Sequence, residues 1–194
     1  MDEYWKNFTV VDETRDDLGG NLRHGDTMAI LPRFWRYLID RFAVRTMLDV
    51  GCGEGHALRC FYRMGVIAHG IDGLKHNAEN AVYPMTVHDI TKSPYCYSCD
   101  LVHCVEVVEH IEDKFVDNVL QTMMNAPVVV MTHGEPGQAG YHHVNLQPKE
   151  YWIKKFETRG YTLSIDNELF REMAGCEISG SYFSTNGLVF LKNR

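Results

Sequence analysis

The chain has 194 residues, 45% of them hydrophobic and 23% charged, which is ordinary for one soluble globular domain with a sizeable core. Its 19 Lys and Arg against 26 Asp and Glu give a formal net charge of −7. A surface that tracks nucleic-acid phosphates has the opposite sign, so no nucleic-acid partner is expected. The acidic N-terminus lacks the apolar region of a signal peptide, and no apolar run approaches membrane-spanning length. These features predict a cytoplasmic protein that does not bind membranes.

Strands and helices are predicted to alternate along the first half of the chain. Residues 1–26 are polar and loop-like, and Pro32 is suited to the first turn of a helix that continues to about Phe42. A buried strand is predicted at 46–50, and a helix with Leu58 and Phe61 facing inward follows the glycines at 51–55. A second strand is predicted at 66–71 and another short helix at 74–81.

The second half continues the same alternation. Strands are predicted at about 85–88, 101–105, 128–132, 161–165 and 188–192. One helix carries an apolar stripe at Ile111, Phe115, Val119 and Met123, and another lies between Pro148 and Gly160. Alternating elements of this kind predict an α/β fold, a doubly wound and mostly parallel sheet with helices on both faces. No linker or repeat divides the chain, so 1–194 is predicted to be a single domain.

A glycine-rich loop follows the first strand of the predicted sheet. Gly51, Gly53 and Gly55 come directly after this strand, and Asp72 ends the second strand 21 residues after Gly51. Glycines let a ligand approach the backbone, and a nucleotide-binding βαβ unit places a ribose-binding carboxylate at about this distance.

The charge of this loop favours a cationic ligand. His56 stands where a dinucleotide fingerprint has its third glycine, and the loop is flanked by the acids Asp49 and Glu54. These carboxylates would repel a pyrophosphate and attract a cation. S-adenosylmethionine carries an ammonium and a sulfonium and has no phosphate, so it fits the loop better than a dinucleotide does.

Four segments in order give the chain a resemblance to a known family. Residues 49–55 resemble the first motif of the class I S-adenosylmethionine-dependent methyltransferases, and 70–73 resemble the second. Residues 87–90 are similar to the end of the third strand, and 100–111 to the fourth strand and the turn after it. The resemblance covers about Leu31 to the C-terminus. It implies a Rossmann-like sheet of seven strands, with the last strand antiparallel and inserted near the sheet edge.

The resemblance also implies how S-adenosyl-L-methionine is held. Asp72 is expected to accept hydrogen bonds from both ribose hydroxyls, or alternatively to cap the next helix. Asp49 is expected to hold the ammonium, and Asp89 the adenine amino group unless it only forms a turn. The full predicted cofactor set is Asp49, Gly51, Cys52, Gly53, Gly55, Asp72, Gly73, Asp89, Ile90 and Glu106.

A loop after the fifth strand carries the predicted catalytic residues, His133, His142 and His143. Methyl transfer to oxygen or nitrogen needs an aligned acceptor and a base for its proton, and histidine is a base near neutral pH. We expect one of the three to be the general base or to position the acceptor, supported by Tyr141 and Asn145. The alternative interpretation is that these histidines and Asn145 only form hydrogen bonds with backbone groups of the loop. His110 is a weaker catalytic candidate.

The remaining histidine, cysteine and N-terminal segments could form a metal site or a lid over the cofactor. The histidine loop with Glu135 lacks a metal-ligand spacing of known type, and the pair Cys96 and Cys99 has no second pair, so no metal site is predicted. Residues 1–30, with Tyr4 and Trp5, are predicted to form a lid over cofactor and acceptor.

The predicted activity is methyl transfer from S-adenosylmethionine to a small-molecule or saccharide acceptor, at oxygen. The acidic balance and the absence of base-methylating motifs favour such an acceptor over DNA or RNA. Two alternatives are a catalytically silent S-adenosylmethionine-binding partner or sensor and, with less support, a nicotinamide-dependent oxidoreductase. The chain is expected to be a monomer or a homodimer.

Overall fold

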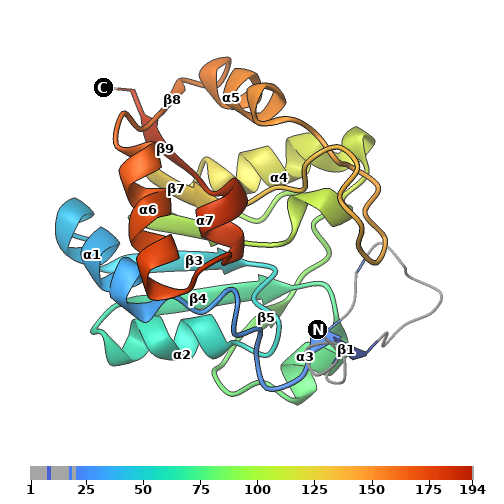
Figure 1. Ribbon diagram of the computed structural model, residues 1–194. Helices are drawn as coiled ribbons and strands as arrows, with labels where there is room; N and C mark the ends of the chain where they lie inside the picture. Colours follow the sequence, from blue (N-terminus) through green and yellow to red (C-terminus); the bar gives the residue numbers. More distant parts are fainter. Residues whose placement is uncertain (1–7, 10–17, 19–20, 194) are drawn as a thin grey trace.

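A seven-stranded sheet forms the centre of the protein in the computed structural model, which describes residues 8–9, 18 and 21–193 (Figure 1). Its strand order is β5-β4-β3-β6-β7-β9-β8. The strands are β3 (Thr46–Val50), β4 (Ile67–Asp72), β5 (Thr86–Val87), β6 (Leu101–Cys104), β7 (Val128–Met131), β8 (Tyr161–Leu163) and β9 (Leu188–Lys192). A separate two-residue ladder pairs β1 (Phe8–Thr9) with β2 (Asn21–Leu22).

The sheet is parallel except for its last strand in the chain. β3 pairs in parallel with β4 and β6, while β9 is antiparallel to both β7 and β8. The predicted fold class is therefore confirmed, including an antiparallel last strand inserted beside the edge. The chain direction across the sheet reverses between β3 and β6, and open α/β sheets bind ligands at such a switch point, beyond the carboxyl ends of the strands.

Helices cover both faces of the sheet (Figure 1). Apolar residues of α1, α2, α6 and α7 pack on one face, and those of α4 and α5 on the other. The helices are α1 (Pro32–Phe42), α2 (His56–Arg63), α3 (Lys75–Glu79), α4 (Val116–Met123), α5 (Lys149–Glu157), α6 (Asn167–Glu177) and α7 (Tyr182–Asn186). Neighbouring residues Met47 and Leu48 point to opposite cores, which is why the strands read as continuous apolar runs.

The helix predicted from Ile111 begins later than expected. Two 3-10 turns, η3 (Val108–His110) and η4 (Asp113–Phe115), precede α4. The carbonyl oxygen of Glu109 accepts hydrogen bonds from the N–H groups of Val144 and Asn145 at 2.9 and 3.1 Å. That carbonyl is therefore tied to the loop after β7 instead of continuing a helical ladder.

The core under α5 provides a stability prediction. Phe156 is fully buried, and its ring stacks on Phe190 of β9 with 3.8 Å between centroids. We expect Phe156→Ala to lower the free energy of unfolding by about 3–5 kcal/mol, because it removes apolar contacts and leaves a cavity. Urea unfolding measures this loss. Ile165, 99% exposed, supplies the matched control, since Ile165→Ala should change stability by less than about 0.5 kcal/mol.

Candidate cofactor and acceptor site

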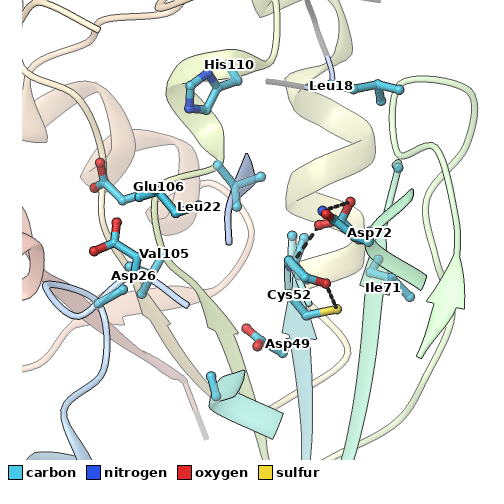
Figure 2. A pocket seen from close by; sticks show the side chains of 18 of the residues that line it. Leu18, Leu22, Asp26, Asp49, Cys52, Ile71, Asp72, Val105, Glu106 and His110 are labelled. Atoms are coloured by element: carbon cyan, nitrogen blue, oxygen red, sulfur yellow. Dashed lines mark hydrogen bonds between the residues drawn. The ribbon is translucent and has the colours of Figure 1, made fainter. Parts of the chain in front are cut away.

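A cavity of about 370 Å³ opens at the carboxyl ends of β3, β4 and β6 (Figure 2). The glycine loop forms its floor. Gly51, Gly53 and Gly55 all have positive φ, and Gly51 is also packed so closely that a Cβ would lie 2.4 Å from Val107 Cγ2. Gly51, Cys52 and Gly53 line the cavity. Gly55 does not; it precedes α2 with a left-handed φ of 81° and so turns the chain into the helix.

Asp72 lies at the end of β4, on the cavity wall opposite Glu106 (Figure 2). Its Oδ2 accepts a hydrogen bond from Gly53 N at 2.9 Å, and its Oδ1 accepts from Leu74 N at 2.8 Å and from Asn77 Nδ2 at 3.1 Å. Burial raises the pKa of this carboxyl to about 6. A carboxylate can accept about four hydrogen bonds, so capacity is left for a ligand hydroxyl.

Asp49 and His103 form a buried pair below the glycine loop. The Asp49 Oδ1 lies 2.7 Å from His103 Nδ1, and their exposed fractions are only 3% and 4%. Both residues line the cavity. The histidine fixes the orientation of the carboxylate that the sequence assigns to the cofactor ammonium. His103 is a site residue that sequence reasoning missed, because a histidine inside an apolar strand carries no motif.

Asp89, Ile90 and Gly73 line the cavity beyond β5 and β4. The Asp89 Oδ1 accepts hydrogen bonds from Thr91 N at 3.0 Å and from Thr91 Oγ1 at 2.6 Å. Asp89 therefore forms the turn that the alternative interpretation expected, while also facing the cavity where the resemblance places the adenine. The two interpretations are compatible.

Glu106 follows β6 and has an unusual backbone conformation, with φ at 56°. Thr132 stabilises it, since Glu106 N donates to Thr132 Oγ1 at 2.8 Å and Thr132 Oγ1 donates to Glu106 Oε1 at 2.9 Å. Burial raises the pKa of Glu106 to about 7. Burial and the charge of Glu106 also hold the pKa of the fully buried Glu109 well above its ordinary range.

The predicted catalytic histidines lie in different surroundings. His143 lines the cavity, together with Tyr141, whereas His133 and His142 are not among the lining residues. His133 is 1% exposed, and its Nε2 is 3.9 Å from Glu135 Oε1. The structure thus brings only one of the three into the cavity wall.

The weaker candidate His110 joins His143 in that wall. The two rings meet edge to face with 5.1 Å between centroids, and burial lowers the pKa of both, that of His110 to about 4. Asn145, predicted as support, is buried below them and its Nδ2 donates to Val108 O at 3.4 Å.

The cavity wall is strongly acidic. No Lys or Arg lines it within the described part of the chain, whereas six carboxyl groups do: Asp26, Asp49, Glu54, Asp72, Asp89 and Glu106. Such a wall favours cationic or neutral ligands over anionic ones. Asp26 also accepts a hydrogen bond from Tyr182 of α7 at 3.0 Å, and neither residue had a sequence signal.

The sheet order, the glycine loop and the acid at the end of the second strand together define a class I S-adenosylmethionine-dependent methyltransferase. A family model described as "Methyltransferase domain" matches residues 23–166, and the chain belongs to that family. The predicted family and enzyme class are confirmed.

Individual relatives differ in their acceptors. The chain is 28% identical over 120 residues to the ubiquinone biosynthesis O-methyltransferase of Saccharophagus degradans, a match that covers 56% of this chain and 48% of that protein. The chain thus spans about half the length of this curated relative.

Solved structures share the fold at low sequence identity. The magnesium protoporphyrin IX methyltransferase of Synechocystis, solved with bound S-adenosylmethionine, has a TM-score of 0.62 at 13% identity, covering 82% of this chain and 75% of that one. A sugar N-methyltransferase of Streptoalloteichus has a TM-score of 0.66 at 14% identity, covering 88% and 90%.

Within the described residues, the structure contains no helix that combines the length and the apolar character needed to cross a bilayer.

Proposed function

We propose that this protein transfers the methyl group of S-adenosylmethionine to a hydroxyl oxygen of a small-molecule or saccharide acceptor. The observation that supports this most directly is the acidic cavity, which has the glycine loop and Asp72 on one side and His110 and His143 on the other. A cationic methyl donor suits the first side, and the histidines stand where an acceptor would enter.

The proposed cofactor contacts lie at the carboxyl ends of the parallel strands. The backbone of Gly51 and Gly53 approaches the methionine part, and Asp49 attracts its ammonium. Asp72 accepts from a ribose hydroxyl, while Asp89 and Ile90 contact the adenine. Gly55 shapes the start of α2 rather than the contact surface.

The acceptor side includes His143 as the general base or acceptor-positioning group. An in-line displacement requires the acceptor oxygen, the methyl carbon and the sulfur to be aligned, with the acceptor proton removed. His143 lines the cavity, and this favours it over His133 and His142. Described residues of the predicted 1–30 lid also line it, namely Leu18, Leu22, Gly25, Asp26, Ala29 and Ile30. Tyr4 and Trp5 lie outside the described residues, and the lid, the cytoplasmic location and a monomeric or homodimeric state stay predictions.

Release of S-adenosylhomocysteine, measured over a panel of acceptors, tests the function. We expect turnover with a hydroxylated sugar, polyol or phenol and none with phosphorylated analogues, which the acidic wall would repel. Tight cofactor binding without turnover on any acceptor would instead support the silent binding protein. Turnover confined to amines would contradict the assignment to oxygen.

The pKa of Asp72 predicts how cofactor affinity changes with pH. The pKa of this carboxyl is about 6, and the charged form keeps an acceptor site for a ribose hydroxyl that protonation would remove. The apparent Kd for S-adenosylhomocysteine should therefore rise about tenfold between pH 6.5 and 5, and comparison with Asp72→Asn separates this rise from any change near pH 7 caused by Glu106 in the same cavity. Titration calorimetry at several pH values measures this rise, which should be smaller in Asp72→Asn. An equal rise in that variant would assign the effect to another group.

A further inference from the structure

The acceptor side of the cavity contains a cluster of unsatisfied metal-ligand groups. Glu109, His110 and His143 each bring one ligand atom to within 4.8 Å of the other two. By strict hydrogen-bond geometry, both carboxyl oxygens of Glu109 and the Nδ1 atoms of His110 and His143 are buried without a partner within the described part of the chain, although the Glu109 carboxyl lies beside that of Glu106. Buried polar atoms are almost always satisfied by protein, water or an ion, and here they come together from three potential metal ligands, which makes this cluster a candidate ligand site.

The carboxyl group of Glu109 is the strongest indication of a bound cation, because it is the most deeply buried of the three. The exposed fraction of Glu109 is 0%, and it lies behind the cavity wall, close enough to the lining residue Glu106 for the charge of Glu106 to act on it. A cation bound between the carboxylate and the two imidazoles would satisfy all three side chains.

The backbone holds the three side chains in place. Val144 N and Asn145 N donate to Glu109 O, which joins the turn carrying Glu109 and His110 to the loop carrying His143. The His143 ring packs on Gly140 so tightly that a Cβ there would lie 2.1 Å from the ring Cε1. These segments are far apart in sequence, so the cluster depends on the fold.

We propose that Glu109, behind the cavity wall, and His110 and His143, in it, bind a divalent transition-metal ion with an open position toward the acceptor. Two imidazoles and one carboxylate are a ligand set suited to Zn²⁺, Fe²⁺, Co²⁺ or similar ions, whereas Mg²⁺ prefers oxygen ligands. In a tetrahedral site, ligand atoms about 2.1 Å from the ion lie about 3.4 Å apart, so a pair at the 4.8 Å limit must move closer by more than about 1 Å. The acceptor's hydroxyl oxygen is the metal ligand that fills the open position.

This inference rests on the proposed function only for the identity of that last ligand. An imidazole nitrogen that binds an ion cannot also accept a proton, so in the metal-bound protein His143 positions the acceptor through the ion. The metal site itself involves only residues of this chain, and metal binding can be measured without any acceptor.

Titration calorimetry and visible absorption with Co²⁺ on chelator-treated full-length protein test the site. We expect one Co²⁺ per chain, with d–d bands of a nitrogen and oxygen environment, and similar binding of Zn²⁺. Glu109→Gln, His110→Ala and His143→Ala should each weaken binding at least about tenfold. Gly140→Ala removes no ligand and should also weaken it, because it displaces the His143 ring.

His88 provides the matched control. It lines the same cavity near β5, and its Nε2 contacts Ser93 O at 2.8 Å, so His88→Gln should bind Co²⁺ like the unaltered protein. Thermal unfolding of each variant checks that it is folded, and Glu109→Gln preserves the side-chain shape. Binding that is absent, or that persists in all three ligand variants, would overturn the metal site.

The metal site and the proposed function can fail separately. Full methyl transfer by chelator-treated protein that binds no Co²⁺ would reject the metal site and leave the methyltransferase assignment intact. Stoichiometric Co²⁺ binding lost in the three ligand variants would support the site even if no hydroxylated acceptor were methylated.

Discussion

Asp72→Ala is expected to weaken S-adenosylhomocysteine binding by at least about tenfold. The ribose would lose its charge-assisted hydrogen bond to this carboxylate, which contributes about 1.5–3 kcal/mol. The glycine loop would also lose an anchor, because Gly53 N donates to Asp72 Oδ2. Titration calorimetry at pH 7.5, where the carboxyl is ionised, measures the change directly.

Asp100 offers a closely matched control for this substitution. Like Asp72 it is half-buried and accepts three hydrogen bonds, from Arg45 N, Thr46 N and Thr46 Oγ1, but it does not line the cavity. Asp100→Ala should lower stability and leave cofactor affinity within about twofold. If both variants bound the cofactor equally well, Asp72 would be only a structural acid.

The β-strands and the cofactor side of the cavity were predictable because their signals are local. A buried parallel strand reads as a continuous apolar run, and the positive φ of Gly51 demands glycine within the loop itself. Strand boundaries were predicted to within a few residues, and Thr46–Val50 was predicted without error.

The predictions missed structure that depends on distant contacts. Helices α6 and α7 were not predicted, and the apolar stripe from Ile111 suggested one helix where two 3-10 turns intervene. The cause is the pair of hydrogen bonds from the 144–145 backbone to Glu109 O, which no local pattern reveals. The same long-range link selects His143 for the cavity wall.

Sequence also could not rank the three loop histidines. They share one Gly-rich segment, and each is a plausible base by residue type alone. The backbone places the three histidines in different surroundings: His142 has a φ of 49°, and His133 is buried at the start of the loop. His143 instead packs on Gly140 and faces the cavity with His110.

Because of this separation, His143→Ala is expected to lower kcat by about 10²–10⁴ while leaving the Kd for S-adenosylhomocysteine within about twofold. The range is that of a lost general base, and loss of a positioning group would reduce turnover in the same direction. Single-turnover rates and calorimetry on the same preparation separate the two quantities.

His142→Ala is the informative comparison, because it changes the adjacent histidine, which does not line the cavity. Its turnover should exceed that of His143→Ala by at least about tenfold, since the side chain it removes does not line the cavity. If His142→Ala were instead the more damaging substitution, the loop would have to rearrange on acceptor binding, and the base would be a residue that now lies outside the cavity lining. Equal and negligible effects of both substitutions would remove the loop from the chemistry, and the acids of the wall, Glu106 foremost, would be the next groups to test.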